Sequence, residues 1–235
     1  RNIEFIKSLE DIAKGESFIS KQHPDVLDDF ADIIGGEYKV GKEGLHYSPK
    51  ADRKKRLTMI ESSSSVRSLL DIGFYLRHSA EIGDLLIIDE PELNLHPANQ
   101  RKLARLFARL INIGIKVFIT THSDYIIKEI NTLVMLNYKK ESDSVKAIMH
   151  KYKYNEHELV DASRIKVFIS EINKVKLDGN SKASNIQTLV PAVIDEYYGI
   201  EARSFDKTIE EMNAIQESII LGRKWYATKR IKNGS

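Results

Sequence analysis

Cysteine is absent from this sequence of 235 residues, and so are long hydrophobic runs. Without cysteine the chain forms no disulfide and no thiolate metal site, which fits a cytoplasmic protein. No apolar run approaches the roughly 20 residues that cross a membrane, and no signal-peptide pattern opens the chain. We therefore expect a cytoplasmic protein that does not enter the membrane. Because the sequence starts at Arg1 rather than Met, we also expect a fragment or a processed product.

An excess of one charge sign is lacking too, because 36 lysines and arginines stand against 34 aspartates and glutamates. This near balance argues against non-specific nucleic-acid binding through bulk charge. Local basic clusters remain at residues 50–56 and 223–232, and nucleic-acid phosphates are one candidate partner for them. A solvated surface explains the same clusters, and we favour that interpretation. With 42% hydrophobic and 30% charged residues, the chain is globular and fits one large domain or two small ones.

The strongest signal is a run of four aliphatic residues at 85–88 that leads directly into the acid pair Asp89 and Glu90. A second apolar run at 117–119 leads into a Thr-Thr-His-Ser segment. Continuous apolar runs predict strands buried on both faces of a parallel sheet, and a helix over 97–112 supplies the crossover between them. Polar residues at the carboxyl ends of such strands lie at the ligand-binding edge of the sheet. The layout therefore predicts nucleotide hydrolysis.

The rest of the pattern predicts an α/β fold: a largely parallel sheet with flanking helices and a small C-terminal β/α extension. We expect helices over 2–22, 25–34, 66–79, 97–112 and 124–130, and strands at 37–40, 45–48, 85–89, 116–120 and 133–136. After residue 137 we expect strands at 145–152, 166–169 and 174–177 and helices over 186–198 and 204–221. Three segments follow from this order: 1–54 with helices and a hairpin in an arm subdomain, 55–137 with the catalytic core, and 138–235 completing the lobe.

The acids and the histidine at the sheet edge suit hydrolysis of a phosphoanhydride, which needs a metal ion, a positioned water and charge stabilisation. Asp89 is placed to orient Mg²⁺, and Glu90, which faces the other way along the strand, is placed to orient or deprotonate the water. His122 is a candidate hydrogen-bond donor to the γ-phosphate. Ordinary alternatives exist, since strand-end acids often cap the next helix and such a histidine is often a structural group.

The segment from Asp89 to Pro97 reads Asp-Glu-Pro-Glu-Leu-Asn-Leu-His-Pro, and it resembles the Walker B motif, catalytic glutamate and D-loop of ABC-type ATPases. His122 resembles their switch histidine. This residue order is similar to that of the OLD-like and RecF-like branch, which includes the PtuA subunit of Septu-type phage defence. The resemblance covers residues 55–136 well and the final helix more weakly. It implies an ABC-type C-terminal lobe that uses ATP and Mg²⁺, with Asp89 at the metal and Glu90 and His122 catalytic.

Four serines, Ser62 to Ser65, precede an expected helix, and a simple N-cap and loop explain them. By resemblance they correspond to the signature motif, which contacts the γ-phosphate bound to the opposite subunit of a dimer. Ser63 and Ser64 match the polar positions, whereas Ser65 stands where the family usually has glycine, and this departure weakens the implied contact. The resemblance thus implies nucleotide binding by Ser62, Ser63, Ser64, Ser65 and the D-loop residue Asn94.

A phosphate-binding P-loop is missing from the sequence. Residues 36–43 come close to the pattern G-x4-G-K-[ST], but Glu43 replaces the hydroxyl residue and no buried strand precedes Gly36. We predict a β-hairpin at that place instead. By resemblance the P-loop belongs to an N-terminal lobe, which we expect on a separate chain or on a part removed from this one. We therefore expect this chain alone not to hydrolyse ATP.

Partners and biological role rest on the resemblance. It implies a homodimer or higher oligomer that opens and closes at the nucleotide interface and controls an effector, such as a nuclease, in prokaryotic phage defence. DNA repair or maintenance of the RecF or SMC type is an alternative role. A non-catalytic adaptor is a further alternative, supported by Ser65 and the missing P-loop but opposed by the intact Glu90. A nuclease within residues 137–235 is disfavoured because the acids there are scattered.

Overall fold

The computed structural model describes residues 11–41, 44–175, 184–195, 197, 199–200 and 211–220. The chain divides into two compact units. The first unit covers residues 1–164 and 196–199, and the second covers residues 165–195 and 200–235. The segment boundaries expected after residues 54 and 137 remain a prediction.

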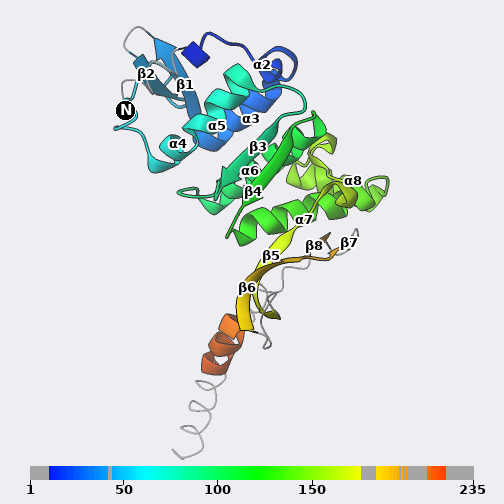
Figure 1. Cartoon of the computed structure of the whole chain (residues 1–235). Helices are drawn as coiled ribbons and strands as arrows, with labels where there is room; N and C mark the ends of the chain where they lie inside the picture. Colours follow the sequence, from blue (N-terminus) through cyan, green and yellow to red (C-terminus); the bar gives the residue numbers. More distant parts are fainter. Residues whose placement is uncertain are drawn as a thin grey trace, which may run out of the picture. The chain divides into compact units, whose positions relative to one another are not determined.

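Two short helices, α2 and α3, lie near the start of the described part of the first unit (Figure 1). α2 (Phe18–Gln22) begins after Ser17, whose hydroxyl accepts a hydrogen bond from the Ser20 amide. α3 (Pro24–Ile34) has proline in its first turn, where no backbone donor is lost, and ends at Gly35 in the left-handed conformation, φ 73°. The sequence predicted α3 closely.

A hairpin follows α3. β1 (Gly36–Gly41) and β2 (Gly44–Pro49) pair antiparallel, with Tyr38 opposite Tyr47. The predicted hairpin is therefore confirmed, and the near match to a P-loop has no helix behind it. By contrast, the single helix predicted over 2–22 is interrupted at residues 13–17, and residues 2–10 lie outside the described part.

The helix predicted over 66–79 consists of three consecutive pieces. They are α4 (Ser64–Ser68), α5 (Leu70–Phe74) and one turn of π-helix (Tyr75–Ser79). Gly73 in α5 is required by packing, because a β-carbon there would lie 2.7 Å from both Phe30 and Tyr38. This close approach lets α5 pack directly against α3 and β1.

The centre of the first unit is a parallel strand pair with a helical crossover. β3 (Leu85–Asp89) and β4 (Lys116–Thr120) pair with Leu85 opposite Lys116 and Asp89 opposite Thr120, and α6 (Pro97–Asn112) connects them. Strand, helix and strand all lie where the sequence predicted them. Within the described part of the chain β3 and β4 form no larger parallel sheet, and the β1–β2 and β5–β6 pairs are antiparallel.

One face of this strand pair is uncovered among the described residues. Leu85, Ile87 and Phe118 lie on it with 58%, 65% and 55% of their surface exposed. Leu86, Ile88, Val117 and Ile119 point the other way and pack against the hydrophobic core. The prediction that both strands are buried on both faces is therefore wrong for the described residues, because nothing among them covers the outer face.

Two helices replace two predicted strands after β4. α7 (Asp124–Tyr138) runs through the strand predicted at 133–136, since no proline or glycine interrupts it. α8 (Asp143–Tyr152) replaces the strand predicted at 145–152. Its apolar residues follow helical rather than alternating spacing, i, i+3, i+4 and i+7. They are Val145, Ile148, Met149 and Tyr152.

Ion pairs tie α6 to both of its helical neighbours. Glu129 of α7 is buried and binds Arg101 and Arg105 of α6, each with a 2.6 Å contact from Nε. Arg109, near the end of α6, is buried too and bonds the carboxylates of Asp25 and Asp29 in α3. Because buried charges need such partners, these contacts fix α6 and the crossover that positions β3 and β4.

The second unit contains a two-stranded ribbon. β5 (Phe168–Val175) and β6 (Ser184–Pro191) pair antiparallel along eight residue pairs. β5 is one strand where two were predicted, at 166–169 and 174–177, and β6 contradicts the helix predicted over 186–198; residues 176–177, 196 and 198 of these predictions lie outside the described part. β7 (Ile194–Asp195) and β8 (Gly199–Ile200) are short. Residues 211–220 are helical as predicted, while 204–210 and 221 lie outside the described residues. None of the described helices has the length and apolarity needed to cross a membrane.

Candidate functional site

The carboxyl ends of β3 and β4 bring the predicted metal ligand to a polar sheet edge. Asp89 lies opposite Thr120, and its exposed carboxylate accepts a hydrogen bond from the Thr120 hydroxyl. The Glu90 amide in turn donates to the Thr120 carbonyl at 3.1 Å and to its hydroxyl oxygen at 3.2 Å. Thr120 therefore orients both members of the acid pair.

Glu90 and His122 meet at this edge. His122 Nε2 lies 3.3 Å from Glu90 Oε1, and the imidazole is largely exposed to solvent. Glu90 has a positive φ of 46°, which side-chain-bearing residues rarely adopt. Such backbone strain is concentrated at functional sites because it fixes a side chain in a required direction. The structure thus brings together Asp89, Glu90 and His122, the three residues that the sequence singled out for chemistry.

The donor atoms suit magnesium bound together with a nucleotide. Magnesium prefers oxygen ligands and keeps several waters, so that one or two carboxylates and the substrate phosphates hold it. Asp89 offers one exposed carboxylate at the edge. Within the described ranges, no group of three or more acidic or histidine side chains is placed to hold a metal ion by itself. The residues therefore fit a shared Mg²⁺–nucleotide site and not a protein-only metal cage.

Glu92 is a residue of this site for which sequence analysis predicted no role. Its side chain is buried, and its Oε1 accepts hydrogen bonds from the Thr121 hydroxyl at 2.8 Å and from the His122 amide at 2.7 Å. Its only sequence signal is its position between Pro91 and Leu93 in the acid-rich motif. Burial of a charged residue in a loop is a tertiary property, so the sequence pattern did not reveal it.

The four serines have different surroundings. Ser62 is buried and its hydroxyl donates to the Thr58 carbonyl at 2.9 Å. Ser63 is the N-cap of α4, because its hydroxyl accepts from the Val66 amide at 3.3 Å. Ser64 is exposed, and Ser65 Oγ lies 2.8 Å from Ser63 Oγ. Nucleotide binding by these serines remains a prediction.

The loop that carries Asn94 lies against the serine-led helix. The Ser68 hydroxyl of α4 donates to the Leu93 carbonyl at 3.2 Å. Asn94 is exposed and left-handed, with φ 64°, a conformation that asparagine tolerates better than most residues. The predicted nucleotide-binding role of Asn94 is likewise untested by this arrangement.

Replacing Ser63 and Ser64 one at a time tests which of the two serines caps α4. Ser63→Ala removes the α4 cap, so we expect the free energy of unfolding to fall by about 1 kcal/mol. Ser64→Ala removes only an exposed hydroxyl, so we expect a change within roughly 0.5 kcal/mol. Urea denaturation followed by circular dichroism measures both. Equal losses in the two variants contradict the assignment of Ser63 as the cap.

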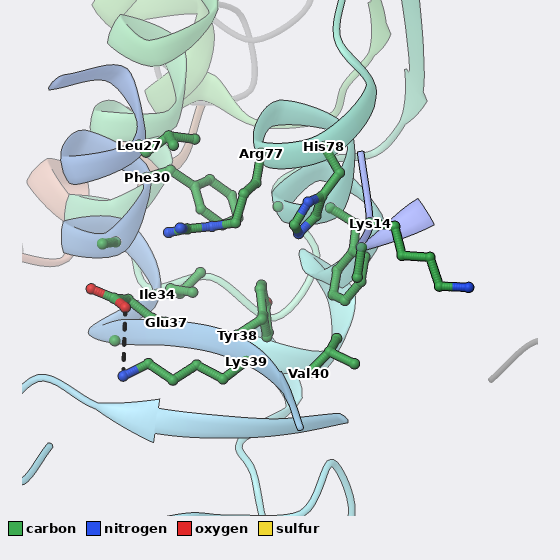
Figure 2. Close-up of a pocket in the computed structure, with 15 residues that line it drawn as sticks. Lys14, Leu27, Phe30, Ile34, Glu37, Tyr38, Lys39, Val40, Arg77 and His78 are labelled. Carbon is green, nitrogen blue, oxygen red and sulfur yellow. Dashed lines mark ion pairs between the residues drawn. The ribbon is translucent and has the colours of Figure 1, made fainter. Parts of the chain in front are cut away.

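A separate cavity of about 440 Å³ lies between α3, β1 and α5 (Figure 2). Phe30, Tyr38 and Phe74 form its apolar wall, and the Arg77 side chain extends across it. Burial raises the pKa of the Tyr38 phenol, as do the neighbouring Tyr47 and Asp71, so Tyr38 stays neutral and donates to the Val66 carbonyl. None of the residues predicted from the sequence lines this cavity.

Comparison with known proteins identifies an ATPase domain in this chain. A protein-family model described as an AAA ATPase domain matches residues 2–127, more than half of the chain. No curated protein matches. Four solved chains match, among them one from work on the structural biochemistry of ATP-driven dimerization and DNA-stimulated activation of SMC ATPases. It is 14% identical, with 91% of this chain and 98% of that chain covered and a TM-score of 0.43.

Proposed function

The chain belongs to the AAA ATPase domain family, and from this premise we propose that it supplies the metal-orienting and water-activating half of an ATP-hydrolysing site. The observation that carries the proposal is the meeting of Asp89, Glu90 and His122 at one sheet edge, with 3.3 Å between His122 Nε2 and Glu90 Oε1. ATP hydrolysis with Mg²⁺ is the chemistry that these groups and the family support together.

Each of the three side chains has a role that its position permits. Asp89 orients the magnesium-bound nucleotide from the end of β3. Glu90 lies beside it, where a carboxylate orients the attacking water and accepts its proton. His122 reaches the same space from the end of β4 and donates a hydrogen bond to the γ-phosphate. Mg²⁺, when bound, neutralises charge on the phosphates, and positioning by the protein provides the rest of the catalysis.

The phosphate-binding loop comes from outside these 235 residues in our proposal. No segment of the sequence satisfies the P-loop pattern, and the near match is the β1–β2 hairpin. The uncovered face formed by Leu85, Ile87 and Phe118 supports this view, because strands of parallel sheets are ordinarily covered on both faces. The same face ends at Asp89. We therefore propose that a second α/β lobe docks here and brings its phosphate loop to the acid pair.

Substitution of the uncovered face tests the docking of this lobe. We expect the double variant Leu85→Ser/Phe118→Ser to lower ATP turnover by the complete assembly, because polar groups at a buried contact weaken association. The stability of the isolated chain should change little, since both side chains are more than half exposed. The assembly is purified through this chain, and its phosphate release measures ATP turnover. Thermal denaturation of the isolated chain measures its stability.

A matched control comes from the ribbon of the second unit. Leu189 and Phe168 are also exposed, at 71% and 55%, so that Leu189→Ser/Phe168→Ser replaces the same residue types elsewhere. We expect this control to retain turnover. Parental turnover in Leu85→Ser/Phe118→Ser contradicts the proposed docking face.

The wider role is proposed on the motif resemblance. In this proposal two copies close on ATP in the ABC manner, and Ser63, Ser64 and Asn94 of one copy reach the nucleotide held by the other. The OLD-like and RecF-like branch, with PtuA of Septu-type defence, supports an ATP-controlled effector such as a nuclease in phage defence. DNA maintenance is the alternative that uses the same chemistry.

A further inference from the structure

Glu92 joins the two loops that carry the proposed catalytic groups. It lies in the loop after β3, and its Oε1 accepts from both Thr121 and His122 in the loop after β4. The side chain is only 9% exposed. Its other oxygen, Oε2, is buried and has no hydrogen-bond partner among the described residues.

Burying the Glu92 carboxylate with one oxygen unpaired costs folding free energy. We infer that the carboxylate is kept because it positions the loop after β4. A buried polar atom without a partner loses its hydration and gains nothing in return. The apolar alternative at this position leaves the His122 amide and the Thr121 hydroxyl without their acceptor. The hydrogen bonds to Oε1 therefore hold the loop after β4 in one place, while Oε2 stays buried without a partner among the described residues.

His122 depends on this contact for its position. Its side chain is 85% exposed, so packing does little to hold the imidazole. Its backbone amide, in contrast, is bound at 2.7 Å to Glu92. A second bridge lies next to the first, since the Ser123 hydroxyl donates to Gln100, which donates to the Leu95 carbonyl at 2.9 Å.

We propose that Glu92 is a positioning residue that sets the distance between His122 and Glu90, and this inference rests on the proposed function. In this proposal Glu92 binds neither the nucleotide nor the metal, because Oε1 is committed to two donors and Oε2 is enclosed. It acts through the His122 backbone. Small displacements of a reacting group are enough to slow an enzyme, so a fixed amide matters for the reaction.

Amide hydrogen exchange in the chain itself tests the contact without any nucleotide. In Glu92→Ala we expect the His122 amide to exchange about tenfold faster, while amides of α6 keep their parental rates. Glu92→Gln retains an oxygen that accepts from both donors, so we expect its His122 amide to stay close to parental. Should Glu92→Ala fail to fold, Thr121→Val removes one donor and should speed exchange at residues 122 and 123.

Glu158→Ala is the matched control. Glu158 is also a buried glutamate that accepts from a backbone amide, that of Asn155 at 2.8 Å, but it lies in the short 3-10 helix Glu156–Glu158. We expect parental exchange at His122 in this variant. Unchanged exchange at His122 in both Glu92→Ala and Thr121→Val overturns the proposal.

ATP turnover by the complete assembly gives the second readout. We expect Glu92→Ala to lower kcat by about 10- to 100-fold with little change in KM, and Glu92→Gln to restore most of it. If Glu92→Gln is as inactive as Glu92→Ala, the charge itself is required and the positioning role is wrong. If the proposed ATPase function is wrong, turnover will be insensitive to Glu90→Gln. The hydrogen-exchange result for Glu92 does not depend on that outcome.

Discussion

Glu90→Gln is expected to lower ATP turnover by the complete assembly by about 10²- to 10⁴-fold, the range that general acid–base catalysis contributes. Glutamine has the shape of glutamate but accepts no proton from the attacking water. Asp89 stays in place to orient the metal, so we expect ATP to bind with parental affinity. Phosphate release at saturating ATP measures turnover, and a fluorescent ATP analogue measures binding.

Glu81→Gln provides the control for this experiment, since Glu81 is an exposed acid in the turn before β3. We expect it to retain parental turnover. A non-catalytic adaptor predicts equal rates in the parent, Glu90→Gln and Glu81→Gln. Equal rates therefore favour the adaptor over the ATPase and contradict the role given to Glu90.

Leu106→Ala is expected to reduce the free energy of unfolding of the chain by about 2–5 kcal/mol. Leu106 lies in the middle of α6, is 1% exposed and belongs to the hydrophobic core. Truncation removes buried methyl groups and leaves a cavity in a helix that is held on both sides by α3 and α7. Urea denaturation measures the loss as a lower midpoint with an unchanged slope.

Leu85→Ala is the matched control, because it truncates the same residue type on the uncovered face of β3. We expect a change within about 0.5 kcal/mol in the isolated chain. If Leu85→Ala is as destabilising as Leu106→Ala, then the face is covered in solution, and the docking face that we propose is unavailable.

Apolar spacing, proline and glycine predicted the secondary structure correctly where these local signals agreed with one another. The β3–α6–β4 crossover was predictable because each strand is a short apolar run and α6 shows amphipathic spacing after a proline. The hairpin was predictable from its glycines. The predicted strand at 145–152 failed because its apolar spacing fits a helix. The predicted helix over 186–198 failed because the residues of β6 pair with β5. Strand pairing is non-local, so a single segment does not contain it.

The sequence by itself determined which polar residues end β3 and β4: the order of residues predicts Asp89, Glu90 and His122 at one sheet edge. Only the tertiary structure decided that Glu90 and His122 meet, that Glu92 is buried between their loops, and that no described residue covers one face of β3 and β4. The physical reason is the same in each case. Residue types along a strand define which groups are available, whereas distance, burial and exposure depend on segments about 30 residues apart that are brought together by folding.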